Sequence, residues 1–149
     1  MTWISEAKSE STATKEDIWA NYLDVVGWKN WDSELAFSQL DGPFVVGSIG
    51  KLKPRKGPVT RFTITEVSAN QSFESVAVMP HRLLPLVRLA FKHQLTSLPD
   101  GNTQILHRAQ VSGLLGPLAA RLMGTELSAG LKTATSKLAK HVLSKAAEK

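Results

Sequence analysis

The C-terminal part of the chain carries the feature that most restricts its fold, a single apolar stripe at helical spacing. The stripe recurs at steps of three and four residues and consists of Ala119, Met123, Leu127, Leu131, Ala134, Leu138 and Val142. This spacing places the apolar side chains on one face of an α-helix. Pro117 falls in or just before the first turn, where its missing amide hydrogen is harmless. We therefore predict one helix over residues 115–147, about 45–50 Å long, that needs an apolar surface to cover.

The region before this helix supplies such a surface. Between residues 34 and 112, short runs of β-branched and aromatic residues alternate with turn sequences rich in Gly, Pro, Asn and Asp. This texture is typical of an antiparallel meander, and connections this short exclude parallel crossover units. We predict strands near residues 34–40, 47–53, 59–68, 72–79, 86–98 and 103–112.

The N-terminal segment adds one strand and a helical connection. Residues 2–11 alternate with a period of two, which predicts a strand with one charged, wet face. Thr14, with Asp17 three residues later, is a helix N-cap pattern and predicts a short helix over 15–24. A second helical turn or a tight loop is expected over 27–32. Residues 1–149 then form a single α+β domain: a six- or seven-stranded antiparallel sheet, two short helices after the first strand, and the long helix across one face of the sheet.

The composition narrows the chemistry that this domain can carry. The chain has 149 residues and no cysteine, which excludes disulfides, thiolate metal sites and a cysteine nucleophile. A chain of this length buries enough surface to fold without such links. The sequence also lacks the motifs of serine hydrolases, zinc proteases and nucleotide-binding enzymes. We expect no metal and no cofactor.

The net charge of +5 raises the question of a charged partner. Much of the basic excess is spread along the predicted C-terminal helix, where it forms a solvated face, and no aromatic interleaving or helix-turn-helix pattern accompanies it. Nucleic-acid binding is therefore not expected. No window of 18 apolar residues occurs, so we expect no integral membrane association. Because the N-terminus has no secretion-signal pattern, a cytoplasmic location is the default expectation.

The last two predicted strands each carry one histidine in an otherwise apolar row. These rows are Leu89, Phe91, His93 and Leu95 on the first strand and Ile105, His107, Ala109 and Val111 on the second. If the turn at 99–101 pairs Leu98 with Asn102, residues that face each other sum to 200. His93 then lies opposite His107, with Cβ atoms about 5 Å apart.

Two further groups of apolar residues lie where polar ones are usual. Leu83 and Leu84 occupy a loop between two prolines, and at the start of the long helix Leu114, Leu115, Leu118 and Leu122 point away from the main stripe. Something must cover these side chains. The candidates are the Leu83–Leu84 loop, a ligand, or a second copy of the chain in a homodimer.

The order of elements, together with several sequence words, resembles a known superfamily. The words include 14–19 (TKEDIW), 27–32 (GWKNWD), 40–44 (LDGPF), 61–67 (RFTITEV), 91–95 (FKHQL) and 112–118 (SGLLGPL). Over nearly the whole chain they are similar to the polyketide cyclase/dehydrase-like subgroup of the SRPBCC superfamily, which also includes START-like lipid carriers and birch-pollen-allergen-like proteins. Lys29 replaces the usual proline between the two tryptophans, a departure that affects only the local turn.

The resemblance implies a helix-grip fold with a cavity between the sheet and the long helix. It implies that the cavity binds or transforms an apolar small molecule, polyketide- or lipid-like, without implying catalysis. We expect the cavity walls to include Phe62, Ile64, Phe91, Ile105, Met123 and Leu127. Leu83 and Leu84 either form a lid over the cavity entrance or pack against the long helix. Trp28 and Trp31 either stack on a ligand at the cavity mouth or cap the end of the core.

The histidine pair leaves two interpretations open. His93 and His107 are either a neutral, hydrogen-bonded pair that orders the hairpin or orients a ligand, or an acid–base pair that acts on a carbonyl compound. A metal site is not expected, because two histidines without a nearby carboxylate are an incomplete ligand set. Binding of a small hydrophobic or aromatic molecule is the preferred prediction. A cyclase or dehydratase is the alternative, and a protein- or membrane-surface module acting through the Lys-rich helix is the third option.

Overall fold

The computed structural model describes residues 2–79 and 86–147. The elements follow one another as β1 (Trp3–Ser11), α1 (Lys15–Leu23), the 3-10 helix η1 (Val25–Asn30), β2 (Leu35–Asp41), β3 (Ile49–Pro54), β4 (Thr60–Ser68), β5 (Ser72–Met79), β6 (Val87–Ser97), β7 (Thr103–Ser112) and α2 (Gly116–Ala147). Each predicted strand and helix is confirmed to within about two residues at its ends.

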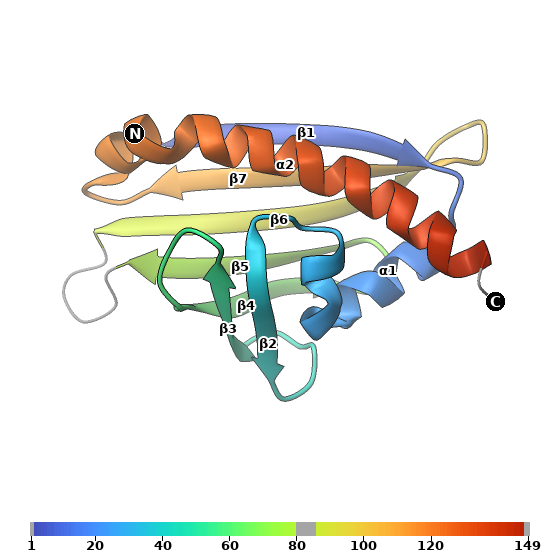
Figure 1. Ribbon diagram of the computed structural model, residues 1–149, viewed down its shortest axis with the longest axis horizontal. Helices are drawn as coiled ribbons and strands as arrows, with labels where there is room; N and C mark the ends of the chain where they lie inside the picture. Colours follow the sequence, from blue (N-terminus) through green and yellow to red (C-terminus); the bar gives the residue numbers. More distant parts are fainter. Residues whose placement is uncertain (1, 80–85, 148–149) are drawn as a thin grey trace.

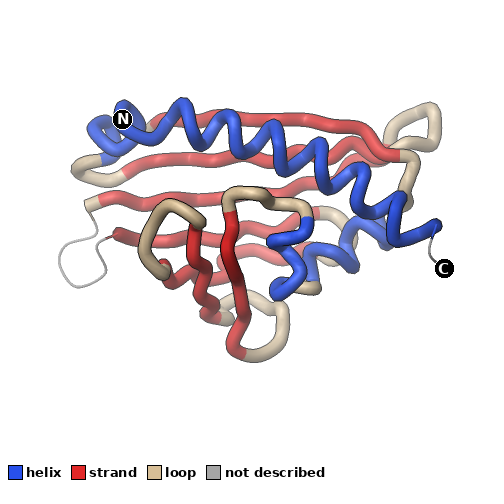
Figure 2. The backbone as a smooth tube through the Cα atoms, in the orientation of Figure 1, coloured by secondary structure: helices blue, strands red, loops and turns tan. Residues whose placement is uncertain are grey.

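A single antiparallel sheet holds the strands in the order β1-β7-β6-β5-β4-β3-β2. It curves around α2, which runs along its inner face and packs against β1 and β7, with fewer contacts to β6 (Figures 1 and 2). The first strand therefore forms one edge of the sheet and pairs with the last strand, although the two are far apart in sequence. This arrangement confirms the α+β class and the seven-stranded version of the predicted sheet.

The two short helices begin at side-chain caps. The Thr14 hydroxyl accepts a hydrogen bond from the Asp17 amide at 3.1 Å, which starts α1 where the sequence predicted it. The Asp24 carboxylate then accepts one from the Gly27 amide at 3.2 Å and starts η1. The second helical turn consequently covers residues 25–30, two residues earlier than expected.

The stripe of α2 faces the sheet as predicted. Ala119, Leu131, Ala134, Leu138 and Val142 are buried, and Met123 and Leu127 are partly buried. A glycine allows a close approach of the helix to β1, because a Cβ atom at Gly124 would lie 3.2 Å from the Trp3 ring. The space that this glycine leaves is filled by close helix–sheet packing.

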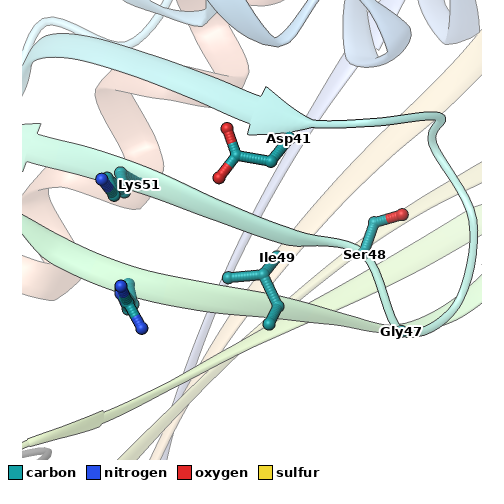
Figure 3. A pocket seen from close by; sticks show the side chains of 6 residues that line it. Asp41, Gly47, Ser48, Ile49 and Lys51 are labelled. Atoms are coloured by element: carbon teal, nitrogen blue, oxygen red, sulfur yellow. The ribbon is translucent and has the colours of Figure 1, made fainter.

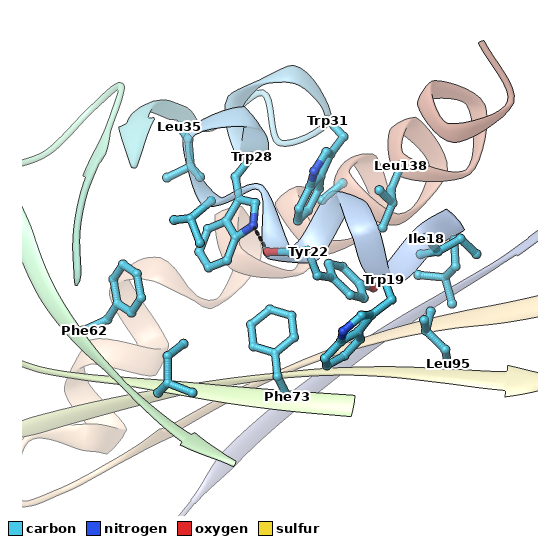
Figure 4. Packing of buried hydrophobic residues seen from close by; sticks show 14 of the residues in the cluster. Ile18, Trp19, Tyr22, Trp28, Trp31, Leu35, Phe62, Phe73, Leu95 and Leu138 are labelled. Carbon is cyan, nitrogen blue, oxygen red and sulfur yellow. Dashed lines mark hydrogen bonds between the residues drawn. The ribbon is translucent and has the colours of Figure 1, made fainter. Parts of the chain in front are cut away.

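Helix α1 fills one end of the space under α2. Ile18, Trp19 and Tyr22 project from α1 into a cluster with Phe73 of β5, Leu95 of β6 and Leu138 of α2 (Figure 4). Trp19, Tyr22 and Phe73 meet one another edge to face, with ring centroids 5.1–6.2 Å apart. We call this region the packed end.

The apolar residues at the start of α2 remain outward. Leu114 and Leu122 are both 77% exposed, and Leu115 and Leu118 are also exposed. The Leu83–Leu84 loop, one of the three candidates to cover them, lies outside the described residues. Within residues 2–79 and 86–147, no helix is both long and apolar enough to cross a membrane.

Candidate functional site

A cavity of about 340 Å³ lies between the inner face of the sheet and the middle of α2. Its wall is built from η1 and the residues after it, from the β3–β4 turn, and from the inner faces of β4, β5, β6 and β7. Much of this wall is apolar, with Trp28, Trp31, Leu35, Leu52, Phe62, Ala77, Leu89, Phe91, Met123, Leu127, Leu131 and Ala134. The cavity begins where the packed end stops, because α1 does not reach this part of the sheet.

The structure brings most of the predicted cavity residues together. Phe62, Phe91, Met123 and Leu127 line the cavity, and so do Trp28 and Trp31. Leu83 and Leu84 lie outside the described residues.

Ile64 and Ile105 do not line the cavity, and this expectation was wrong. Both side chains are fully buried in the main core cluster. Each shares the inner face with a cavity residue, Phe62 or His107, but lies two positions along its strand toward the packed end. The side chains that cover this end exclude them from the cavity.

The two tryptophans combine the two roles that the sequence left open. Trp28 donates its indole N–H to the Tyr22 carbonyl at 2.9 Å and stacks on Phe62 with ring centroids 5.7 Å apart. Gly50 makes room for Phe62 here, because a Cβ atom on Gly50 would clash with the Phe62 ring. Trp28 and Trp31 are therefore buried core residues whose remaining surfaces form part of the cavity wall.

The register of the last hairpin places the histidines side by side, as predicted. The Leu98 amide donates to the Asn102 carbonyl, and His93 pairs with His107 across β6 and β7. Their ring centroids are 4.4 Å apart. Both side chains also line the cavity, so the pair lies at the boundary between the cavity and the packed end.

Each histidine contacts an aromatic ring of the packed end: His107 through a hydrogen bond, and His93 through ring stacking. Tyr22 Oη and His107 Nε2 share a hydrogen bond of 2.9 Å, and the Phe73 ring lies parallel to the His93 ring with centroids 4.2 Å apart. The sequence analysis missed both contacts. The helical spacing of Ile18, Trp19 and Tyr22 indicates an inward-facing tyrosine, but nothing in the sequence shows which part of the sheet α1 covers.

Burial keeps the side chains of His93, His107 and Tyr22 uncharged. It lowers the pKa of His107 to about 3, and burial together with the neighbouring His107 lowers the pKa of His93 well below its ordinary value. Burial also raises the pKa of the Tyr22 phenol far above its ordinary value. At neutral pH, two neutral imidazoles therefore line the inner wall of the cavity, and the neutral Tyr22 phenol holds the His107 imidazole from the packed end.

Two buried nitrogen atoms in the cavity wall have no hydrogen-bond partner within the described part of the chain. They are His93 Nδ1 and Trp31 Nε1. The residue His93 is half-buried, whereas Trp31 is only 2% exposed. Buried polar atoms normally have partners, so these two mark positions where a bound molecule can supply one.

The mouth of the cavity is charged. Asp32, Glu34, Glu126 and Lys56 line it, with Asp32 and Glu34 just after η1 and Glu126 on α2. The Glu34 side chain lies close to α2: a Cβ atom added to Gly130 would be 3.4 Å from Glu34 Cγ. Burial raises the pKa of Asp32 to about 6. The hydrogen bond from the Glu34 amide and the charge of Lys137 oppose this rise in pKa, whereas the charge of the Glu34 carboxylate adds to it. The sequence analysis did not find this group, because its members come from three separate segments.

A second hollow lies away from the inner face, beside the β2–β3 turn (Figure 3). Asp41, Gly47, Ser48, Ile49, Lys51 and Arg61 line it. Asp41, Ile49 and Arg61 are exposed, so this is a surface depression. The cavity under α2 is more enclosed and more apolar, and it is the stronger candidate for a functional site.

The sequence matches no protein-family model and no curated protein sequence. The fold, however, matches several solved structures. A protein from Mesorhizobium loti is 20% identical with a TM-score of 0.70, covering 97% of this chain and 98% of its own. Norcoclaurine synthase from Thalictrum flavum, in complex with dopamine and hydroxybenzaldehyde, is 14% identical with a TM-score of 0.73, covering 97% and 88%. Zhui aromatase/cyclase from Streptomyces sp. R1128 is 10% identical with a TM-score of 0.74, covering 95% and 94%.

These likenesses extend over nearly all of the chain at identities of 20% or less. They confirm the fold that the resemblance implied, a curved antiparallel sheet gripping a long C-terminal helix. At such identities a shared fold does not carry over an activity, so the function must be argued from the cavity of this chain.

Proposed function

We propose that this helix-grip protein binds one small, largely apolar molecule in the cavity between its sheet and α2. The observation that carries this proposal is a partly enclosed space of about 340 Å³ whose wall includes Trp28, Phe62 and Leu127. Its volume and its largely apolar wall, interrupted by a few polar groups, are typical of small-molecule sites. Tightly packed cores do not leave such spaces without a reason.

An aromatic or polyketide-like ligand fits this wall best. Flat rings can pack against the surfaces that Trp28, Trp31, Phe62 and Phe91 present to the cavity. A polar group on the ligand can meet His93 on the inner wall. The fold is shared with an aromatase/cyclase and with norcoclaurine synthase, whose structure holds two aromatic compounds, and this supports the same ligand class.

Acid–base catalysis by the histidine pair is the second candidate. It is favoured by the position of His93 and His107 side by side in the cavity wall. The electrostatics weaken it, because a general base works best with a pKa near the operating pH, and burial lowers the pKa of His107 to about 3. Neutral imidazoles that hydrogen-bond a ligand explain the same geometry. Binding is therefore the primary proposal, and cyclisation or dehydration of a carbonyl compound is secondary.

The binding proposal can be tested with N-phenyl-1-naphthylamine, an uncharged dye that fluoresces in apolar surroundings. We expect saturable binding of about one dye per chain and a higher melting temperature, because the ligand binds only the folded state. Leu127→Trp should reduce dye binding at least tenfold by filling the cavity. Leu122→Trp is the matched control, because this residue lies on the same helix but is 77% exposed.

Two outcomes would reject binding in this cavity. One is the absence of saturable dye binding to the folded wild-type protein. The other is equal dye affinity in the Leu127→Trp and Leu122→Trp variants, with circular dichroism confirming that both are folded. Turnover of a candidate polyketone by the wild-type protein, lost when either His93 or His107 is changed to Gln, would instead favour the enzyme.

A further inference from the structure

The cavity mouth carries negative charge in a protein that is positive overall. Asp32, Glu34 and Glu126 contribute three carboxylates to the lining, against one ammonium group from Lys56. The net charge of the chain is +5. The lining therefore has the opposite sign to the rest of the molecule, and it lies where a ligand must pass or remain.

Among the residues that the structure describes, no ion pair neutralises these carboxylates. Within the described ranges, the Lys or Arg nitrogens that come within 4 Å of a carboxylate belong to the pairs Lys92–Glu66 and Arg108–Glu6, neither of which lies at the cavity. Lys137 is close enough to lower the pKa of Asp32, but it does not form such a pair with it. Negative charge at the mouth is thus available to a bound molecule.

A buried donor beside the acidic mouth points independently to a ligand. Trp31, the residue before Asp32, is only 2% exposed and lines the same cavity. Its indole N–H has no acceptor among the residues that the structure describes. An indole nitrogen can only donate, so the atom that completes this site must be an acceptor such as a hydroxyl or carbonyl oxygen.

We propose that the cavity selects cationic ligands: a small apolar or aromatic body with a protonated amine held among Asp32, Glu34 and Glu126 at the mouth. The body fills the apolar interior, where an oxygen on it can accept the Trp31 N–H. A carboxylate on the same body would be repelled by the mouth, and a neutral group would gain nothing from it. This inference rests on the proposed function, because it assigns the charge of the molecule that the cavity binds.

The test compares three probes with one aromatic body and different charges. They are 2-(1-naphthyl)ethylamine, 2-(1-naphthyl)ethanol and 1-naphthylacetate, each titrated calorimetrically into the full chain at pH 7.5. We expect the amine to bind at least fivefold more tightly than the alcohol, and the carboxylate to bind most weakly. Because salt screens exposed charges, raising the ionic strength should weaken amine binding and leave alcohol binding unchanged.

Single variants identify the groups responsible. Glu126→Gln and Glu34→Gln should each weaken amine binding about two- to fivefold, as removal of one exposed charge pair does, and should change alcohol binding by less than twofold. Glu10→Gln removes the same charge from an exposed position on β1 and should alter neither affinity.

The outcomes separate this inference from the function beneath it. If the alcohol or the carboxylate binds as tightly as the amine, the cavity has no preference for cations and the inference is wrong, while the binding function stands. The same conclusion follows if Glu10→Gln weakens amine binding as much as the mouth variants do. If none of the three probes binds, the proposed function itself fails.

Discussion

The two halves of the space under α2 are built on the same sheet and by the same helix, yet one is filled and the other is hollow. Beneath the C-terminal half of α2, the side chains of α1 pack against Phe73, Leu95 and Leu138. Beneath its middle, Met123 and Leu127 face a cavity of about 340 Å³. The difference is α1, a helix of nine residues that is long enough to fill only one end.

The polar groups of the two halves also differ: those at the packed end have partners within the protein, and those at the cavity mouth do not within the described chain. At the packed end and its boundary, Tyr22 and His107 bind each other and burial keeps them neutral. At the cavity mouth, Glu34 and Glu126 are exposed and unpaired within the described chain. Polar groups that the protein satisfies internally contribute to its stability. Groups that it leaves unsatisfied beside a cavity are available for ligand recognition.

The largest expected difference between the two halves is the loss of stability when one leucine in each is truncated to alanine. Leu138→Ala removes a fully buried side chain from the packed end and should cost about 2–5 kcal/mol of the free energy of unfolding. Leu127→Ala enlarges a space that already exists and should cost less than half as much. Urea unfolding of the two variants measures both values.

The control for this pair is Lys140→Ala, an exposed position on the same helix, which should change stability by less than about 0.5 kcal/mol. Equal losses for the two leucine variants would contradict the division of the interior into a packed end and a cavity.

Lowering the pH below 6.5 should destabilise the folded protein through the buried histidines. The pKa of His107 is about 3 in the folded protein and 6.5 ordinarily, so below pH 6.5 the unfolded chain binds a proton that the folded chain does not. The free energy of unfolding should therefore fall by roughly 1–2 kcal/mol between pH 6.5 and pH 5 from this group alone. Urea unfolding at several pH values measures the slope.

A His107→Gln variant tests the source of that slope. Glutamine can keep a hydrogen bond with Tyr22 but does not titrate. The variant should be less stable at pH 7 because its shape fits the packed end less well, and its stability should vary less with pH. Parallel pH profiles for the variant and the wild-type protein would show that other groups cause the acid sensitivity.

Local patterns account for how much of the fold the sequence could predict. The Thr14 cap, the stripe of α2 and the alternation of β7 each depend on neighbours within a few residues, and each was confirmed. The opposition of His93 and His107 was also predictable, because the tight turn between their strands determines the register.

Contacts between distant segments set the limit of prediction. Ile64 and Ile105 have the same alternation as Phe62 and His107, yet Phe62 and His107 line the cavity whereas Ile64 and Ile105 are buried in the core away from it. The acidic mouth combines residues after η1 with one residue of α2, nearly a hundred positions later. No sequence pattern within one segment predicts that residues so far apart in the chain will lie at the same cavity mouth.

The acidic mouth should give a smaller pH effect of the opposite sign. The pKa of Asp32 is raised to about 6 from 3.8, so between these values the folded chain binds the extra proton. Its contribution to the free energy of unfolding therefore falls as pH rises through this window. Asp32→Asn, which keeps the acceptor for the Glu34 amide, should stabilise the protein by about 1 kcal/mol at pH 7 and have no effect near pH 4.

The matched control is Asp41→Asn, an exposed aspartate at the surface depression. It should leave stability unchanged at both pH values. A stability gain at Asp32 that is equally large at pH 4 would show that ionisation of its carboxyl group is not the cause.

The smallest effect is expected where the two halves meet, at His93. His93→Gln keeps a polar side chain that can hydrogen-bond a ligand from the inner wall, but it removes titration. Because binding depends on shape and one hydrogen bond, the affinity for 2-(1-naphthyl)ethanol should change by less than tenfold, or about 1.4 kcal/mol. Calorimetric titration of the variant and the wild-type protein measures this. A much larger loss would mean that His93 dominates recognition, and the cavity would then depend more on its boundary with the packed end than on its apolar wall.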